Sequence, residues 1–302
     1  MPSNQTPLGA LPSRFRRERL LIIGCGDVGQ RLVRVQRHVR VVALTSSPAR
    51  VPALRAQGVT PLVGNLDAPA TLQRLAGWAT RVVHLAPPPL QGETDPRTLA
   101  LTRVWLQRTA PRSLVYGSTS GVYGDCAGAW VSEARPVNPQ TPRAQRRVDA
   151  ERRLQHAARL RGHAMRVSVL RIPGIYAPDR EGGTPHERLL RGTPVLVRED
   201  DVFTNHIHAD DLARACQLAL WRGQTQRRYN VNDDCQMLMG DYFDQAAALY
   251  GLAMPPRISR AQAPTVLSAM QLSFLSESRR LVNARMKREL RLQLRYATLS
   301  RT

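Results

Sequence analysis

Residues 20–32 read LLIIGCGDVGQRL, a short apolar run followed by three glycines and a segment with helical character. Such a run predicts a buried strand that turns directly into a helix. Gly24 permits the tight turn, Gly26 lets backbone N–H groups approach a pyrophosphate, and Gly29 lets the helix pack on the strand. The helix N-terminus then faces the anion. The residues expected to hold a dinucleotide are Gly24, Cys25, Gly26, Asp27, Val28 and Gly29. The alternative is a glycine turn needed only for packing.

Further apolar runs follow at near-regular intervals, separated by segments with helical character. The strands are predicted at 20–23, 39–44, 62–63, 81–85, 113–116 and 167–172. The helices between them are predicted at 28–36, 48–56, 69–76, 97–108 and 144–160. Apolar, β-branched runs that alternate with helices are typical of a parallel sheet covered on both faces. The sequence therefore predicts an α/β fold with a doubly wound parallel sheet of the Rossmann type.

The 302 residues are expected to form three parts. Residues 1–18 are polar and Arg-rich, which predicts a disordered tail. Residues 19–173 form the dinucleotide-binding domain. After Pro173 the rhythm of strands and helices breaks, and residues 174–302 are expected to form a smaller substrate-binding lobe interleaved with the sheet. Helical patterns return there at 210–221, 240–250 and 277–292.

Composition narrows the class of protein. Hydrophobic residues make up 42% of the chain, which is enough for a packed core, and no apolar run approaches the roughly 18 residues of a membrane span. The four cysteines are widely spaced and form no CxxC pair, so neither a zinc site nor a disulfide framework is expected. We expect a cytoplasmic protein with no membrane partner and no metal.

The chain is strongly basic, with 44 Lys and Arg against 23 Asp and Glu, a formal net charge of +21. This balance predicts attraction to phosphates. A compositional origin competes with that interpretation, because Lys287 is the only lysine and Arg, Ala and Pro all have GC-rich codons. Aromatic residues are only 5% and no helix-turn-helix or zinc pattern is present, so nucleic-acid binding is expected as a side activity at most.

The type of dinucleotide is predicted from the end of the second strand. NAD sites usually carry a carboxylate there, about 20 residues beyond the glycines, for the ribose 2′-hydroxyl. This chain has no Asp or Glu between Asp27 and Asp67. NADP is therefore the expected cofactor, with NAD as the alternative. The residues expected to receive the 2′-phosphate are Ser46, Ser47 and Arg50, with Arg31 as a further candidate. Ser47 also fits a helix N-cap.

Six motifs in order carry a family resemblance. They are GCGDVG at 24–29, GNL at 64–66, VVHLA at 82–86, STSGVYG at 118–124, LRIPGIY at 170–176 and HADDLA at 208–213. Over roughly residues 19–296 the chain resembles the short-chain dehydrogenase/reductase superfamily, in its extended branch of NAD(P)-dependent sugar-nucleotide epimerases and dehydratases. The resemblance implies an oxidoreductase or isomerase that acts on a small molecule, a nucleotide-sugar-like substrate. We expect the protein to be a monomer or a homodimer.

The same resemblance implies roles for individual residues. Asn65 takes the place of an Asp that contacts the adenine amine, with Leu66 beside it. Leu85, Ala86 and Pro87 lie beside the nicotinamide half of the dinucleotide. Thr119 falls at the Ser or Thr that hydrogen-bonds the reacting oxygen, although a hydroxyl that satisfies local backbone groups would look the same.

The chain departs from the family at the catalytic pair. The family has Tyr-x-x-x-Lys with Glu four residues later, and counting back from Glu151 places Arg143 at the Tyr and Arg147 at the Lys. Arginine stays protonated, so Arg143 cannot relay a proton. Arg147 is expected to contact the nicotinamide ribose and supply positive charge, and Arg143 to clamp a substrate phosphate or carboxylate. The alternative for both is a solvated basic helix face.

Another group would then have to transfer the proton. Tyr123 is the first candidate and Tyr176 the second, although either is as often a core residue. His206 and His208 flank Ile207, so both are expected on one face of a strand. Asn205 or His206 is expected to touch substrate. Asp210 or Asp211 is expected to cap the following helix. The remaining alternative for the whole chain is a catalytically impaired dinucleotide sensor or scaffold.

Overall fold

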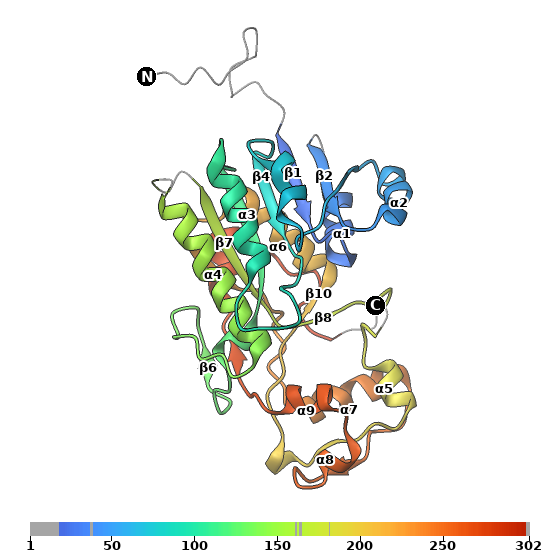
Figure 1. Ribbon diagram of the computed structural model, residues 1–302. Helices are drawn as coiled ribbons and strands as arrows, with labels where there is room; N and C mark the ends of the chain where they lie inside the picture. Colours follow the sequence, from blue (N-terminus) through green and yellow to red (C-terminus); the bar gives the residue numbers. More distant parts are fainter. Residues whose placement is uncertain (1–17, 37–38, 161, 163–164, 181, 300–302) are drawn as a thin grey trace, which may run out of the picture.

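The computed structural model describes residues 18–36, 39–160, 162, 165–180 and 182–299. Its centre is a seven-stranded sheet in the order β11-β7-β5-β4-β1-β2-β3, with every neighbouring pair parallel (Figure 1). The strands are β1 (Arg19–Ile23), β2 (Arg40–Thr45), β3 (Thr60–Val63), β4 (Arg81–His84), β5 (Ser113–Thr119), β7 (Arg166–Ile172) and β11 (Arg227–Asn230). The predicted doubly wound sheet and its six predicted strands are confirmed, and β11 is an addition.

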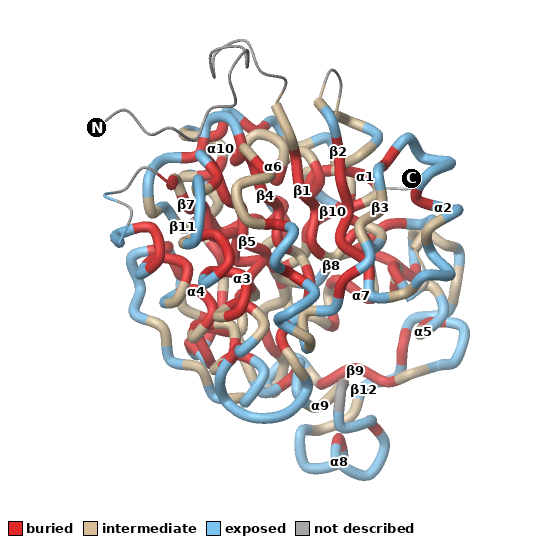
Figure 2. The backbone as a smooth tube through the Cα atoms, turned by 45° about the horizontal axis from the view of Figure 1, so that its top comes forward, coloured by how far each residue is buried: buried red, intermediate tan, exposed pale blue. Residues whose placement is uncertain are grey.

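Both faces of the sheet are covered, as the apolar strands require. Leu20 and Ile22 of β1 pack into one core and Leu21 and Ile23 into the other, because successive side chains of a strand point to opposite faces. The first core is closed by α1 (Asp27–Val35), α6 (Ala209–Arg222) and α10 (Ala284–Leu290). The second is closed by η3 (Pro69–Leu75), α3 (Pro96–Gln107) and α4 (Pro142–Leu160). Buried backbone is accordingly concentrated in the strands and the inner helix faces (Figure 2).

The smaller lobe lies beyond the carboxyl ends of the strands (Figure 1). Three short parallel pairs organise this end of the molecule: β8 (Gly174–Tyr176) with β10 (His206–His208), β9 (Val195–Leu196) with β12 (Arg257–Ile258), and β6 (Trp130–Val131) with β13 (Arg280–Leu281). The helices here are η4 (Ser120–Tyr123), α5 (His186–Leu190), η5 (Arg198–Asp200), α7 (Met239–Tyr250), α8 (Ala263–Val266) and α9 (Ala269–Leu275). A separate core around Leu189, Val195 and Phe243 holds part of it together.

Several sequence-based expectations are refined by the structure. The helix predicted at 48–56 is a short η2 (Pro48–Arg50) followed by α2 (Val51–Ala56), and 69–76 is a 3₁₀-helix. The helix predicted at 277–292 is wrong in its first half, where β13 pairs with β6 instead. The elements α6, β11 and α10 follow residue 174 yet pack with the sheet, so the two parts of the chain interleave.

The predicted tail lies outside the described residues except for Glu18, whose carboxylate pairs with Arg81 at 3.3 Å. Across the described residues, no helix is both long and apolar enough to cross a lipid bilayer.

Candidate functional site

The glycine turn between β1 and α1 has the shape that a dinucleotide requires. Gly24 has φ of +85°, and a Cβ there would stand 2.3 Å from the backbone nitrogen of Ala86. A Cβ at Gly26 would meet no atom within 4 Å, so the backbone faces open space at that point. No side chain caps the first turn of α1, which leaves its N–H groups and the positive end of the helix dipole for an anion. These residues fit the diphosphate of a dinucleotide.

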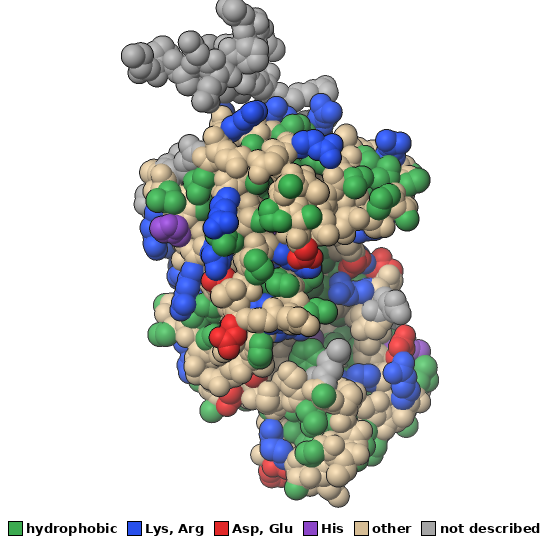
Figure 3. Space-filling view, in the orientation of Figure 1, with side chains coloured by type: hydrophobic (Ala, Val, Ile, Leu, Met, Phe, Trp, Pro, Cys, Tyr) green, Lys and Arg blue, Asp and Glu red, His purple; other side chains and the backbone are tan. Residues whose placement is uncertain are grey.

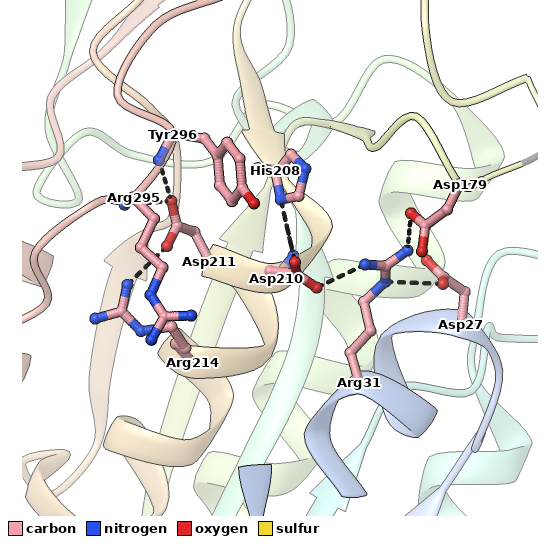
Figure 4. A network of polar contacts seen from close by, with 9 residues as sticks. All are labelled: Asp27, Arg31, Asp179, His208, Asp210, Asp211, Arg214, Arg295 and Tyr296. Atoms are coloured by element: carbon pink, nitrogen blue, oxygen red, sulfur yellow. Dashed lines mark hydrogen bonds and ion pairs between the residues drawn. The ribbon is translucent and has the colours of Figure 1, made fainter. Parts of the chain in front are cut away.

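Arg31, a candidate for binding the 2′-phosphate, is paired instead with carboxylates of the protein itself. Its guanidinium is 6% exposed and donates to Asp27 at 2.9 Å, Asp210 at 2.6 Å and Asp179 at 2.5 Å (Figure 4). Burial alone would lower the pKa of Arg31, but the three carboxylates raise it. Because these three carboxylates already neutralise the Arg31 guanidinium, Arg31 is not available to bind a 2′-phosphate.

Arg50, another candidate for binding the 2′-phosphate, lies beside the glycine turn. It is exposed at the start of α2, and its Nη2 donates to the carbonyl of Cys25 at 2.6 Å, which places its charge against the glycine turn. Ser46 is exposed and Ser47 half-buried at the end of β2. Ser47 occupies the N-cap position of η2, as the sequence predicts, but its side chain makes no capping hydrogen bond.

The residues expected at the two ends of the dinucleotide lie on the same edge of the sheet. Asn65 is exposed after β3, with its Oδ1 accepting from the N–H of Asp67 at 3.0 Å. Leu66 packs against the core. After β4, the N–H groups of Leu85 and Ala86 both donate to the carbonyl of Ile23, at 2.7 and 3.1 Å. This ties the loop that begins there, including the exposed Pro87, to the end of β1.

A cavity of about 510 Å³ opens between the sheet and the smaller lobe. Figure 3 shows the surface hollowed between these two parts. The predicted site residues that line the cavity are Thr119, Arg143, Tyr176, Asn205 and His206. Thr119 ends β5, and its Oγ1 accepts from the N–H of Gly121 at 3.3 Å. Tyr123 and Arg147 are not among the lining residues.

Glu151 fixes the rotation of α4 and thereby the places of Arg147 and Arg143. The Glu151 carboxylate is buried and accepts from Ser118 Oγ at 2.6 Å and from Arg171 at 2.8 Å. Four residues earlier on the same face, Arg147 donates to the Tyr116 hydroxyl at 3.1 Å and to the Gly117 carbonyl at 2.6 Å. Arg147 is therefore held against β5.

Two arginines of the cavity wall make no ion pair with any described residue, namely Arg143 on α4 and Arg188 on α5. Partial burial lowers the pKa of both, and the charges of Arg147 and Arg146 lower that of Arg143 further. The Arg188 guanidinium lies 4.4 Å from the centre of the Phe243 ring. Both positive groups are thus positioned to receive an anion that enters the cavity.

The placement of Tyr123 argues against its predicted catalytic role. The side chain is 1% exposed, its hydroxyl donates to Asn230 at 2.7 Å, and Arg171 stacks on its ring at 4.7 Å. Burial raises the pKa of Tyr123. Tyr176 does line the cavity, but burial also raises its pKa, and its hydroxyl has no hydrogen-bond partner among the described residues. Each of these phenols therefore holds its proton firmly.

Asn205 and His206 are held by the protein itself. The Asn205 amide donates to the carbonyl of Arg279 at 2.8 Å and accepts from the N–H of Leu281 at 2.9 Å, so it tethers β13. His206 stacks on Tyr242 with ring centres 4.2 Å apart, and burial lowers its pKa to about 4. The imidazole is therefore neutral near pH 7.

His206 and His208 both contact the Tyr176 ring edge to face, which confirms that they share one face of a strand. The predicted cap of α6 is wrong: His208 Nδ1 accepts from the N–H of Asp210, while Asp211 accepts from the N–H groups of Arg295 and Tyr296 (Figure 4). Within the described residues, no group of three or more His, Cys, Asp or Glu side chains could hold a metal.

Other residues of the cavity were not predicted from the sequence, among them Arg188, Tyr242, Glu277 and Arg279. No local signal marks them, because whether each side chain reaches the cavity depends on how its segment packs against distant parts of the chain. Glu277 and Arg279 reach the cavity through the pairing of β13 with β6.

Comparison with known proteins agrees with this architecture. A functionally unknown conserved protein from Silicibacter pomeroyi has 30% identity and a TM-score of 0.77, over 93% of this chain and 95% of its own. UDP-glucose 4-epimerase from Thermotoga maritima has 18% identity and a TM-score of 0.74, over 92% and 94%. A double mutant of dTDP-glucose 4,6-dehydratase from Streptomyces venezuelae has 19% identity and a TM-score of 0.73, over 93% of each chain. The last two likenesses show the fold alone.

No curated protein sequence matches the chain. The sequence model of the NAD-dependent epimerase/dehydratase family, however, matches residues 20–232, which include the glycine turn, Thr119 and all of β8, β10 and β11. The chain therefore belongs to the NAD-dependent epimerase/dehydratase family.

Proposed function

We propose that this protein is an NAD(P)-dependent epimerase, dehydratase or reductase that acts on a nucleotide-sugar-like substrate without the usual Tyr and Lys. The observation that carries the proposal is the cavity beside Thr119, with Arg143 and Arg188 in its wall and unpaired among the described residues. A guanidinium presents a planar fork of N–H donors that matches phosphate oxygens. A diphosphate is therefore the anion that these two side chains fit best.

The bound dinucleotide would supply the hydride acceptor or donor. Gly24, Gly26 and the first turn of α1 hold its diphosphate, and Arg50 with Ser46 and Ser47 receives a 2′-phosphate. This assignment makes NADP the preferred cofactor. Its support is the exposed Arg50 charge against the glycine turn and the lack of any carboxylate between Asp27 and Asp67. Two related structures contain NAD together with a nucleotide sugar, which supports the class of both ligands.

The second candidate function is a dinucleotide sensor that binds and does not turn over. The observation that favours it is the position of Arg147, whose guanidinium is committed to Tyr116 and Gly117. Arginine at both positions of the family's catalytic pair removes the usual proton relay. A sensor would bind NADP and leave every nucleotide sugar unchanged.

Calorimetry with NADP and NAD, followed by turnover assays on a panel of UDP- and dTDP-sugars, separates the two candidates. The enzyme proposal expects reduced or oxidised nicotinamide to accumulate, or an epimer or dehydrated sugar to form. Replacing Thr119→Ala should lower that rate. Replacing Arg143→Gln should weaken nucleotide-sugar binding by about tenfold or more, since a hydrogen bond to a charged group contributes ~1.5–3 kcal/mol.

Arg159→Gln is the matched control, because Arg159 is exposed near the end of the same helix and does not line the cavity. It should leave nucleotide-sugar binding unchanged. Binding of NADP without turnover of any sugar would favour the sensor. Failure to bind either dinucleotide would reject both candidates.

A further inference from the structure

One acidic side chain lines the cavity among the described residues, and it is Glu277, in the connection between α9 and β13. Its side chain is 13% exposed, so it faces the cavity rather than open solvent. Glu277 comes from the far end of the chain relative to Thr119, but the fold brings the two together. An ideal Cβ built on Gly121 would stand 3.6 Å from Thr119 Oγ1 and 3.7 Å from Glu277 Oε2. The two oxygens therefore border the same small space.

Arg279 holds the Glu277 carboxylate in that position. Its Nη2 donates to Oε2 at 2.6 Å, while its Nη1 donates to the carbonyl of Gly124 at 2.6 Å. Because Gly124 follows η4, the arginine joins the Glu277 segment to the loop that carries Thr119 and Gly121. Oε1 of Glu277 accepts no hydrogen bond from any described residue, so it remains able to accept one from a ligand.

The cavity offers few other groups for proton transfer. Arg143, Arg180, Arg188 and Arg279 stay protonated. Burial raises the pKa of Tyr176 and of Tyr242. Burial lowers that of His206 to about 4, and its Nε2 is already in contact with Thr204 Oγ1 at 3.2 Å. Glu277 is the carboxylate that lines the cavity among the described residues, and its Oε2 borders the same space beside Gly121 as the Thr119 hydroxyl, which the proposed function places at the reacting atom.

We propose that Glu277 is the acid/base residue of this protein, accepting the proton of the substrate hydroxyl that is oxidised beside Thr119. In that step the O–H proton passes to Oε1 of Glu277 and the carbon gives up hydride to the oxidised nicotinamide dinucleotide. The hydroxyl oxygen becomes a carbonyl. In the reductive direction Glu277 returns the proton. This inference rests on the proposed function and names the residue that replaces the missing tyrosine.

A purely structural ion pair between Glu277 and Arg279 is the competing interpretation, and the experiment is designed to separate the two. Glu277→Gln keeps the size of the side chain and an oxygen for Arg279 but cannot accept a proton. Glu277→Asp keeps the carboxylate and shortens its reach. Glu199→Gln is the control, because Glu199 is exposed in η5 and does not line the cavity.

Turnover is measured against pH with the best nucleotide sugar of the panel. Glu277→Gln should lower kcat by about 10²–10⁴-fold and change the shape of the pH profile of the oxidation rate, because it removes the group that accepts the proton. Glu277→Asp should recover part of the rate and keep the wild-type shape of the profile. Glu199→Gln should match the wild type. A structural role would move stability and KM without changing the shape of the pH profile.

A second readout needs no dinucleotide. Calorimetry of UDP-glucose binding to the cofactor-free protein, in two buffers with different ionisation enthalpies, measures the protons exchanged. The number of protons exchanged on binding should differ between the wild type and Glu277→Gln, because only the wild type has a carboxyl group at this position that can bind a proton.

An unchanged pH profile and unchanged proton exchange in Glu277→Gln would overturn the assignment of Glu277 and leave the proposed function standing. If the wild-type protein turned over no nucleotide sugar, the proposed function and this inference would fall together, since an acid/base residue requires a reaction.

Discussion

Nη1 of Arg180, in the cavity wall, lies 2.9 Å from Oδ2 of Asp27, the first residue of α1. Asp27 also pairs with Arg31, which in turn binds Asp179 and Asp210. The segment that follows β8 is thereby tied by charge to the glycine turn and to the start of α6 (Figure 4). The two sites that we propose in separate parts of the chain, one for a dinucleotide and one for a substrate, thus share one network of ion pairs.

The glycine turn allows a test of dinucleotide binding that is separate from folding. Gly26→Ala should leave the free energy of unfolding nearly unchanged, because its methyl group meets no atom within 4 Å, yet weaken NADP binding by blocking close approach to the diphosphate. Gly24→Ala should destabilise the protein, because it combines a φ of +85° with a clash against Ala86. Denaturant unfolding and calorimetry measure the two effects. Tight NADP binding by Gly26→Ala would argue against this turn as the site.

Arg50 should determine which dinucleotide is preferred. Arg50→Gln should weaken NADP binding by about 10- to 100-fold, since it removes a charge-assisted contact of ~1.5–3 kcal/mol, and leave NAD binding unchanged. Arg55→Gln, an exposed neighbour on α2, serves as the control. Parallel titrations with the two dinucleotides give the ratio of affinities. An equal loss for NADP and NAD would show that Arg50 acts on the glycine turn rather than on the 2′-phosphate.

The buried pair of Glu151 and Arg171 should matter for stability. Glu151→Ala leaves the Arg171 guanidinium, 2% exposed, without its carboxylate, and this should lower the free energy of unfolding by ~3–5 kcal/mol. Glu187→Ala, which breaks an exposed pair with Arg191, should cost less than ~1 kcal/mol. Urea unfolding compares the variants. Similar losses in both would mean that Arg171 finds other partners or water once Glu151 is removed.

Asp233 should make stability depend on pH. Burial raises its pKa to about 8 in the folded protein, far above the ordinary value of 3.8. The folded state therefore holds this proton more tightly than the unfolded state. The contribution is fully present below about pH 4 and is lost as the pH rises toward 8. Asp233→Asn should remove this loss, whereas Glu199→Gln, on an exposed side chain of η5, should keep it. Unfolding measured from pH 4 to 9 tests the slope.

Local sequence patterns were sufficient to predict the sheet and the glycine turn between β1 and α1. The run 20–23 is apolar throughout, and its alternate residues enter the two cores that helices on both faces close. Gly24 is needed by the backbone itself because of its positive φ, whereas Gly26 leaves the backbone facing open space. Such requirements are encoded within a few residues, so they can be read without knowing the rest of the fold.

The hydrogen-bond and ion-pair partners of individual side chains could not be predicted from such short segments. From the sequence, Arg31 was a candidate for binding a phosphate, but in the structure it pairs with Asp179 and Asp210. Tyr123 was a candidate acid, but it is buried and donates to Asn230. Several arginines of this basic chain, including Arg31, Arg171 and Arg279, are internal. The sequence thus determined the layered architecture and the family. Only the tertiary structure decided which charges meet in the cavity, because residues such as Thr119 and Glu277 become neighbours through strand and helix packing that no short segment specifies.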